Sequence, residues 1–315
     1  MKISIIVPCY NEEGNVLRFY EVLKQELSSI LDKIELIFVN DGSRDGTGQK
    51  LHEIADRNEL PVKTIHFSRN FGKEAALRAG LDHADGDYIS IIDADLQQRP
   101  KYILDMLNIL WADERYDAVA CYQGERRETK TLSFFKDSFY KMINAVSEVE
   151  LYRSASDFRT FKRSVRDAIC SMSEKQRFSK GIFAWVGFKT YYMEYQVEDR
   201  FEGETKWSFT KLFKYALDGI FAFSTFPLNC ICLVGMFGGA IGAIWLLALL
   251  ILWAVTGKAV SVVCLILAAL VFLTSTQLFF TGLLGQYLSR MYVEIKDRPM
   301  YIMKEYYHNE DRLEQ

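Results

Sequence analysis

Two long stretches without a charged residue dominate the C-terminal third of this 315-residue chain. The first runs from Gly219 to Gly257 and the second from Ala259 to Ser289, and Lys258 alone separates them. Each exceeds the roughly 20 apolar residues that a helix needs to cross a bilayer. Buried helices of a soluble core are the alternative, but they seldom run this far without a charge. We therefore expect two transmembrane helices joined by a short external loop.

The basic residues around these stretches predict how the chain is oriented in a membrane. The connecting loop has one lysine, whereas seven basic residues flank the outer ends: Lys206, Lys211, Lys214, Arg290, Lys296, Arg298 and Lys304. Because basic loops stay on the cytoplasmic side, we expect both termini in the cytoplasm. No apolar secretory signal opens the chain. The prediction is an integral protein of the inner or plasma membrane with a cytoplasmic N-terminal domain.

Strand-like and helix-like patterns alternate along the N-terminal part of the chain. Strands are predicted at Ile3–Val7, Glu35–Asn40, Val62–Phe67, Tyr88–Ile92 and Ala118–Cys121. Helices are predicted near residues 13–31, 46–57, 73–84 and 101–111. This alternation is typical of βαβ units, so the expected fold class is α/β, with a mostly parallel sheet and helices on both faces.

Polar residues follow each of the first four predicted strands. They are Pro8 to Glu12, Asp41 to Ser43, Arg69 with Asn70, and Asp93 with Asp95. Ligands of such sheets bind beyond the carboxyl ends of the strands, where the strand order switches. Four loops that converge on one crevice predict a nucleotide-type site.

The segment Asp93-Ala94-Asp95 ends the apolar run from Tyr88 to Ile92. In an extended segment, alternate side chains project to the same side, so both carboxylates could reach one divalent ion. The alternative is an ordinary strand end before a capped helix, because Asp95 precedes Pro100 and an amphipathic stretch. The motif alone does not decide between the two.

Two further segments have the aromatic and lysine-rich composition of helices that lie in a membrane interface. They span residues 134–146 and 206–225. Core packing remains open for the first, while the second continues into a predicted span. The predicted organisation is a catalytic-type domain at 1–205, an interface helix at 206–225, two spans within 226–289 and a cytoplasmic tail at 290–315.

Charge and cysteine content exclude some classes of function. The formal net charge of −3 does not favour a nucleic-acid partner. The chain has 6 cysteines, and those of the soluble part (Cys9, Cys121 and Cys170) lack metal-ligand spacing. Reduced thiols are in keeping with a cytoplasmic domain.

Five ordered motifs resemble the signature set of family 2 glycosyltransferases, which have the Rossmann-like GT-A fold. They are Val7-Pro8-Cys9-Tyr10-Asn11-Glu12-Glu13, Val39-Asn40-Asp41-Gly42-Ser43, Ser68-Arg69-Asn70-Phe71-Gly72-Lys73-Glu74, Asp93-Ala94-Asp95-Leu96-Gln97 and Arg200-Phe201-Glu202-Gly203-Glu204-Thr205-Lys206. The resemblance extends over nearly the whole chain. It is strongest to polyprenyl-phosphate sugar synthases, including the two-span bacterial undecaprenyl-phosphate (bactoprenol) glucosyltransferases and the dolichyl-phosphate mannose synthases. One departure is Gln98-Arg99-Pro100, where the family usually has an acidic residue or histidine before two prolines.

The resemblance implies a set of site residues. Metal ligands for Mg²⁺ or Mn²⁺ are Asp95 and then Gln97. Donor-binding residues are Pro8, Tyr10, Glu12, Asp41, Asn70, Lys73 and Asp93. Asp157, in Ser156-Asp157-Phe158-Arg159, is a catalytic base or an orienter of the acceptor.

A lipid monophosphate acceptor should be recognised by basic residues beside the membrane. Arg200 and Lys206 are the candidates for catalytic phosphate contacts, with Arg126 and Lys136 as further ones. A purely topological role for Lys206 stays open. Because a phosphate monoester has its second pKa near 6, the nucleophile is already largely ionised, and direct attack should invert the anomeric centre.

The implied reaction is hexose transfer from a nucleotide-diphosphate sugar, UDP-glucose or a UDP-N-acetylhexosamine, to undecaprenyl phosphate for cell-surface glycan modification. A catalytically idle, sugar-nucleotide-binding membrane scaffold is the alternative. A processive polysaccharide synthase is set aside, because no Q-x-x-R-W segment occurs. The small residues of Gly235–Gly239 and Gly238–Gly242 suit either packing of the two spans or a homo-oligomer, for which the resemblance makes a tetramer plausible.

Overall fold

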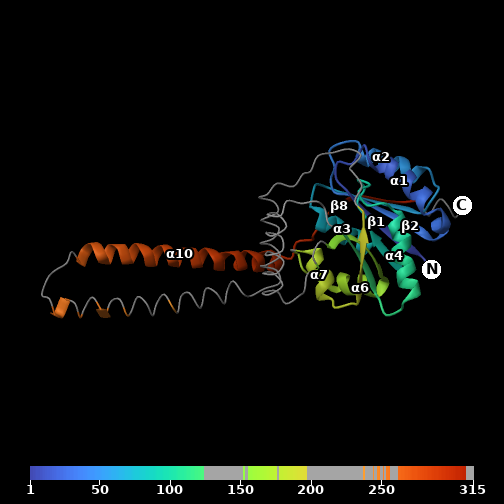
Figure 1. The fold of residues 1–315 in the computed structure, drawn as a ribbon. Coiled ribbons are helices and arrows are strands. Elements are labelled where there is room, and N and C mark those ends of the chain that lie inside the picture. Colours follow the sequence, from blue (N-terminus) through green and yellow to red (C-terminus); the bar gives the residue numbers. More distant parts are fainter. Residues whose placement is uncertain are drawn as a thin grey trace.

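The computed structural model describes residues 1–123, 155–175, 177–196 and 262–309. A few single positions between these ranges are also described (152, 237, 244, 247, 248, 251 and 253–255). Figure 1 shows an α/β domain from which one long helix, α10 (Val262–Ile295), projects.

An eight-stranded sheet forms the centre of the described domain, in the order β7-β5-β6-β4-β1-β2-β3-β8. The strands are β1 (Ile3–Cys9), β2 (Ile34–Asn40), β3 (Val62–Phe67), β4 (Tyr88–Ile91), β5 (Ala118–Gln123), β6 (Ala155–Lys162), β7 (Thr190–Tyr195) and β8 (Met303–His308). Strand β1 pairs in parallel with β2 and β4, and β2 pairs in parallel with β3. Strand β5 also pairs in parallel with β7. Strand β6 is antiparallel to both β4 and β5, and β8 is antiparallel to β3. The predicted α/β fold with a parallel centre is confirmed.

Helices cover both faces of this sheet. They are α1 (Val16–Glu26), α2 (Thr47–Asp56), α3 (Lys73–Asp82), α4 (Lys101–Ala112), α6 (Arg163–Ser171) and α7 (Ser179–Trp185). Apolar side chains of α1, α2 and α4 share one core with Ile5, and those of α3, α6 and α7 share a second core with Ile6. Because successive strand side chains point to opposite faces, strands buried on both sides need continuous apolar runs. This is why β1 and β2 are almost uninterrupted in apolar residues.

The five predicted strands match β1 to β5 within two residues at each end. Three of the four predicted helices match α2, α3 and α4 within two residues at each end, whereas the one predicted near residues 13–31 divides in two. Helix α1 ends at Glu26, and a 3-10 helix follows at Ser28–Lys33. The break coincides with Ser28-Ser29, whose side chains compete for backbone hydrogen bonds and so weaken a helix interior.

The C-terminal segment returns to the sheet and adds β8 antiparallel to β3. The aromatic ring of Tyr301 stacks on Phe67 with centroids 5.0 Å apart, and its hydroxyl donates to Asp82 at 3.0 Å. The fully buried Asn309 accepts from the Val62 N–H at 2.7 Å. This strand was not predicted, because most of its side chains are exposed and no alternating apolar pattern marks it.

Counting only residues that the structure describes, no helix is both long and apolar enough to cross a membrane. Helix α10 overlaps the second predicted span, but several of its side chains are not described. Most of the first predicted span, both predicted interface helices and the glycine pairs lie outside the described residues. The two-span organisation therefore stays a prediction.

Candidate active site at the carboxyl edge of the sheet

The loops that follow β1 and β2 are joined by hydrogen bonds. The Asn11 N–H donates to the Ser43 hydroxyl at 2.9 Å, and the Arg44 N–H donates to the Asn11 side-chain oxygen at 3.0 Å. The Glu12 N–H donates to the Thr47 hydroxyl at 2.8 Å. Asn11 has a positive φ of 55°, a conformation that asparagine tolerates better than most residues. These contacts hold the segment that carries the predicted donor residues Tyr10 and Glu12 against the loop that carries Asp41.

Three of the predicted donor residues lie along β1 and the loop after it. Pro8 pairs with Val39 in the β1–β2 register, one place before the strand ends. Tyr10 and Glu12 follow in the loop, and the Glu12 carboxylate accepts a hydrogen bond from the Asn15 side chain at 2.7 Å. All three residues are thus at the edge where the strand order switches between β1 and β4.

Asp41 organises the loop between β3 and α3. Its carboxylate accepts from the Phe71 N–H at 2.6 Å, from the Gly72 N–H at 3.0 Å and from the Asn70 side chain at 2.9 Å. Burial raises the pKa of Asp41, although the Phe71 and Gly72 N–H groups oppose that rise. The structure therefore brings Asp41 and Asn70 together, as the motif order predicted, with the carboxylate engaged by the loop.

Gly42 allows the two loops to approach each other closely. It has a positive φ of 63°, and a Cβ at this position would lie 2.2 Å from the Arg69 carbonyl carbon. No larger residue fits there, so glycine is required by both space and backbone conformation.

Lys73 joins two carboxylates at the carboxyl edge of the sheet. Its ammonium Nζ lies 2.7 Å from Asp93 Oδ1 and 3.2 Å from Asp157 Oδ2. Asp93 follows β4, and Asp157 belongs to the antiparallel strand β6. The last paired residues of these strands are Ile91 and Arg159, so two further places along the same register bring Asp93 opposite Asp157. The side chains of Lys73, Asp93 and Asp157 are 41%, 31% and 24% exposed, which leaves the cluster open to a ligand.

The ion pairs determine the charge state of Asp157. Burial raises its pKa, but Lys73, Lys180 and Arg159 outweigh this effect and bring the pKa of Asp157 to about 2. Burial lowers the pKa of Lys73, and the two carboxylates outweigh it and raise that pKa. A carboxylate with so low a pKa is a poor proton acceptor at neutral pH. The ion pair with Lys73 holds Asp157 in place, and the choice between its two predicted roles, base or orienter, stays a prediction.

The segment from Asp93 to Gln98 folds into a tight loop. The Gln97 N–H donates to Asp95 Oδ1 at 3.1 Å, and the Asp93 N–H donates to the side chain of the buried Gln98 at 3.2 Å. Leu96 has a positive φ of 59°. This turn, and not a straight extended segment, holds Asp95 and Gln97 close together.

Asp95 and Gln97 provide one carboxylate and one amide oxygen, which is a donor set that suits a hard divalent cation. Among the described residues, no group of three or more His, Cys, Asp or Glu side chains could hold a metal by itself. Magnesium in particular is usually held by one or two carboxylates together with substrate phosphates. The residues therefore fit a metal site that a diphosphate donor completes.

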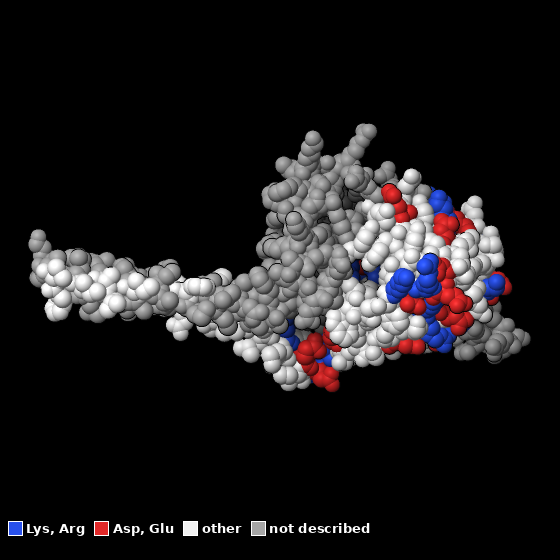
Figure 2. Space-filling view, turned by 60° about the horizontal axis from the view of Figure 1, so that its bottom comes forward, with Lys and Arg blue, Asp and Glu red and all other residues white. Residues whose placement is uncertain are grey.

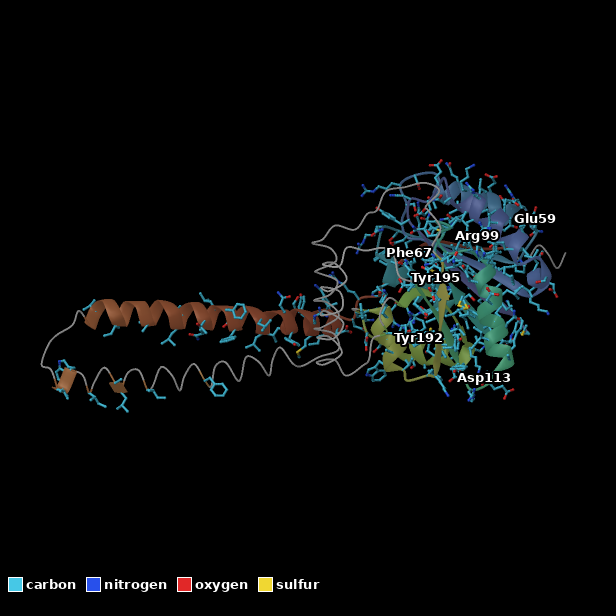
Figure 3. All side chains as sticks on the ribbon, in the orientation of Figure 1. Glu59, Phe67, Arg99, Asp113, Tyr192 and Tyr195 are labelled. Carbon is cyan, nitrogen blue, oxygen red and sulfur yellow. The ribbon has the colours of Figure 1, made fainter. Side chains whose placement is uncertain are left out.

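Arg99, the departure from the family pattern, contacts another element. Its guanidinium Nε donates to Glu26 at 2.7 Å, and the Lys101 N–H donates to the same carboxylate at 2.9 Å. Glu26 ends α1 and Lys101 begins α4, so this contact joins the two helices. Arg99 is labelled in Figure 3.

Sequence reasoning missed one part of this neighbourhood. Ser179, at the start of α7, donates to Glu74 through its N–H at 3.2 Å and also through its hydroxyl. Glu74 follows Lys73, so α7 is fastened beside the ion-pair cluster. No motif marked residues 179–185, because their position depends on long-range packing. The predicted phosphate contacts Arg126, Lys136, Arg200 and Lys206 lie outside the described residues.

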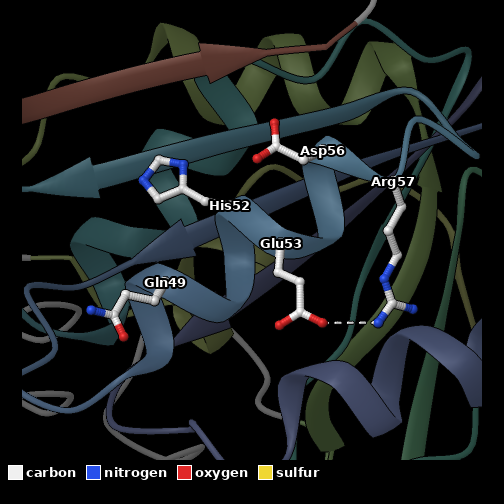
Figure 4. Close-up of a pocket in the computed structure, with 5 residues that line it drawn as sticks. All are labelled: Gln49, His52, Glu53, Asp56 and Arg57. Carbon is white, nitrogen blue, oxygen red and sulfur yellow. Dashed lines mark hydrogen bonds and ion pairs between the residues drawn. The ribbon is translucent and has the colours of Figure 1, made fainter.

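A separate hollow lies on the outer side of α2. It is lined by Gln49, His52, Glu53 and Asp56 of this helix and by Arg57, which follows its last residue (Figure 4). Glu53 accepts from Arg57 at 3.1 Å across it. None of the predicted site residues lines this hollow.

Similarity to known proteins extends over the residues described above. The family model described as glycosyl transferase family 2 matches residues 4–173. A putative glycosyltransferase, CsbB, from Bacillus subtilis is 39% identical, over 96% of this chain and 91% of that protein. A bactoprenol glucosyl transferase from Shigella phage SfII is 38% identical, over 96% and 98% of the two chains. The crystal structure of glucosyl-3-phosphoglycerate synthase from Mycobacterium tuberculosis is 17% identical, covering 70% of this chain and 78% of that one, with a TM-score of 0.46.

Proposed function

The chain belongs to glycosyl transferase family 2, as its motifs predicted, and is a glycosyltransferase; on this premise we propose that it transfers a hexose from a nucleotide-diphosphate sugar to a polyprenyl phosphate. The proposed donor is UDP-glucose or a UDP-N-acetylhexosamine, and the proposed acceptor is undecaprenyl phosphate. The relative named a bactoprenol glucosyl transferase supports this acceptor and favours glucose.

The observation that carries the proposal is the placement of Lys73, Asp93 and Asp157 in one open cluster at the carboxyl edge of the sheet. The Asp95–Gln97 turn adjoins it through Asp93. A donor diphosphate between the turn and the cluster would leave its sugar facing Asp157. In this arrangement, the loops after β1 and β2 would bind the nucleoside of the donor.

Asp95 and Gln97 would hold Mg²⁺ or Mn²⁺, which when bound supplies charge neutralisation for the nucleoside diphosphate leaving group. The other residues act by positioning. Asp157 orients the acceptor, and Lys73 keeps Asp157 ionised and in place. Because the acceptor phosphate needs no strong base, in-line attack on the anomeric carbon would invert its configuration.

Membrane attachment is part of the proposal. The described side chains of α10 that are large and apolar are mostly exposed, among them Leu270, Leu273, Leu278 and Phe279. The sequence has no charged residue from Val262 to Ser289, and the described side chains in the projecting part of this helix are white in Figure 2. An exposed apolar surface of this extent suits burial in lipid. We propose two spans, a cytoplasmic catalytic domain and cytoplasmic termini, with a homo-oligomer as the assembled form.

The experiment uses the full chain in detergent or vesicles with undecaprenyl phosphate and a panel of UDP-sugars and GDP-sugars, each with Mg²⁺ or Mn²⁺. We expect one UDP-hexose to be consumed with formation of a prenyl monophosphate sugar of inverted configuration. Heat-inactivated protein and unphosphorylated prenol are the controls. Binding of a donor without transfer to any lipid phosphate would support the idle scaffold instead.

A further inference from the structure

Helix α7 lies over the face of β6 that carries Asp157. Asp157, Arg159 and Phe161 alternate along β6, so their side chains share one face of the sheet. On that face the ring of Phe183 packs against Phe161, with centroids 5.1 Å apart. The guanidinium of Arg159 lies 3.9 Å from the centre of the same ring. These contacts orient α7 relative to Asp157.

Lys180 lies one helical turn before Phe183 and is close enough to Asp157 for the two charges to interact. Its neighbour Ser179 is hydrogen-bonded to Glu74, the residue after Lys73. The first turn of α7 is thus fastened to the first turn of α3. The backbone of Lys180 therefore directly follows the residue that is hydrogen-bonded to α3, on a helix that packs against β6, the strand of Asp157.

Lys180 and Lys73 differ in their direct contacts with carboxylates. Lys73 contacts Asp93 and Asp157 directly. Lys180 forms no hydrogen bond or ion pair with any other residue that the structure describes, although Asp157 attracts it electrostatically. Burial lowers the pKa of Lys180, and the neighbouring cations Arg159 and Lys73 lower it further. Asp157 and Glu74 raise this pKa without contacting the ammonium, so an anionic ligand placed beside Lys180 would give it a direct partner of opposite charge.

The proposed acceptor brings such an anion. A phosphate monoester carries a charge of about −1.5 to −2 at neutral pH. Repulsion from the ionised Asp157 would keep it away unless a cation offsets the charge, and Lys73 already contacts two carboxylates. We propose that Lys180 binds the phosphate monoester of the acceptor and holds it beside Asp157. This inference rests on the proposed lipid-phosphate acceptor.

The test compares Lys180→Met and Lys180→Arg with the wild type, using the full chain. Lys189→Met is the matched control, because Lys189 is an exposed lysine shortly after α7 that is outside the crevice. Initial rates are measured while undecaprenyl phosphate and the UDP-sugar are varied separately. Inorganic phosphate is added as a competing ligand, to separate recognition of the phosphate from recognition of the lipid.

We expect Lys180→Met to raise the KM for the lipid phosphate by about tenfold or more and to leave the KM for the donor within twofold. Lys180→Arg should recover part of the acceptor affinity, and Lys189→Met should match the wild type. Inorganic phosphate should compete with the lipid in the wild type and should inhibit Lys180→Met at least tenfold more weakly. A thermal shift with the UDP-sugar shows whether each variant is folded.

An unchanged acceptor KM with a reduced kcat would overturn the inference, because Lys180 would then act only through Asp157. A raised donor KM would overturn it too, by assigning Lys180 to the diphosphate. If Lys180→Met does not fold, the same comparison is made with Lys180→Gln and Lys180→Arg. Failure of the proposed function is recognised separately, because the wild type would then transfer no sugar to any lipid phosphate.

Discussion

Lys73 and Asp157 form an ion pair of 3.2 Å that links the first residue of α3 to the start of β6. The two residues are 84 positions apart in the chain (157 − 73). The same ammonium contacts Asp93 at 2.7 Å. Two carboxylates on adjacent strands would repel each other without this cation, so Lys73 lets both remain ionised beside a substrate.

Lys73→Met should reduce kcat by roughly 10²-fold or more, a loss typical of removing one preorganised electrostatic group. Without the ammonium, Asp93 and Asp157 repel each other, and the pKa of Asp157 should rise from about 2. Lys73→Arg should retain more activity, because it keeps a cation. The measurement is the pH dependence of kcat for the three proteins between pH 4 and 9.

The sign of the pH effect follows from the lowered pKa of Asp157. A carboxylate whose pKa is lowered on folding stabilises the protein above its unfolded pKa, and that contribution is lost as the pH falls towards about 2. Asp157 should therefore stay ionised across the assay range. The acid limb of the wild-type profile should lie near pH 6, where the acceptor phosphate titrates. A limb that moves with Asp157→Glu, and not with the acceptor, would make Asp157 the base.

Asp95→Asn should abolish transfer without unfolding the protein, because it removes one carboxylate charge and keeps the shape of the side chain. The Asp95 oxygen that accepts from the Gln97 N–H at 3.1 Å is retained in asparagine. EDTA should likewise stop the wild-type reaction, and Mn²⁺ or Mg²⁺ should restore it. Near-normal turnover of Asp95→Asn at saturating metal would remove Asp95 from the metal site.

Asn309→Ala should destabilise the catalytic domain by about 1–3 kcal/mol, which is the usual effect of leaving buried polar groups unpaired. The Asn309 side chain is fully buried, accepts from the Val62 N–H and donates to the carbonyls of Ala55 and Leu60 at 3.1 and 2.9 Å. Lys304→Ala, on the exposed part of β8, is the control. The apparent melting temperature of the full chain in detergent is measured, and equal values for both variants would show that the hydrogen bonds of Asn309 contribute little.

Arg200→Lys should slow transfer although the charge is kept, because a planar guanidinium can bind a phosphate through two parallel hydrogen bonds and an ammonium cannot. Arg200 and Lys206 are assigned to this role by their motif. The double change Arg200→Ala with Lys206→Ala should be non-additive if both bind one phosphate. Unaltered kinetics of Arg200→Lys for both substrates would mean that only bulk charge matters there.

The predicted topology is tested with single cysteines in a cysteine-free variant. A cysteine at Lys258 should react with a membrane-impermeant thiol reagent added outside intact cells, because only the short loop faces outward in the predicted orientation. A cysteine at Glu314 should react only after the cells are permeabilised. Labelling at Glu314 from outside would reverse the orientation.

Local pattern determined much of the fold. The strands β1, β2 and β4 could be predicted because each is a largely apolar run bounded by polar turns, which is how a strand buried on both faces must read. The chemistry of the loops was also visible, since Asp41, Asp93 and Asp95 follow strands whose carboxyl ends must meet at one edge. The family resemblance rested on these same short segments, and the family match confirmed it.

Tertiary structure decided which of these groups touch. The motif residue Lys73, which the sequence assigned to the donor, contacts Asp93 and Asp157, because the antiparallel register of β4 and β6 sets the two carboxylates opposite each other. Strand β8 and the position of Lys180 on α7 were likewise invisible in the sequence. Both depend on contacts between residues far apart in the chain, and such contacts leave no local period in the sequence, because the partner that stabilises each element lies on another element.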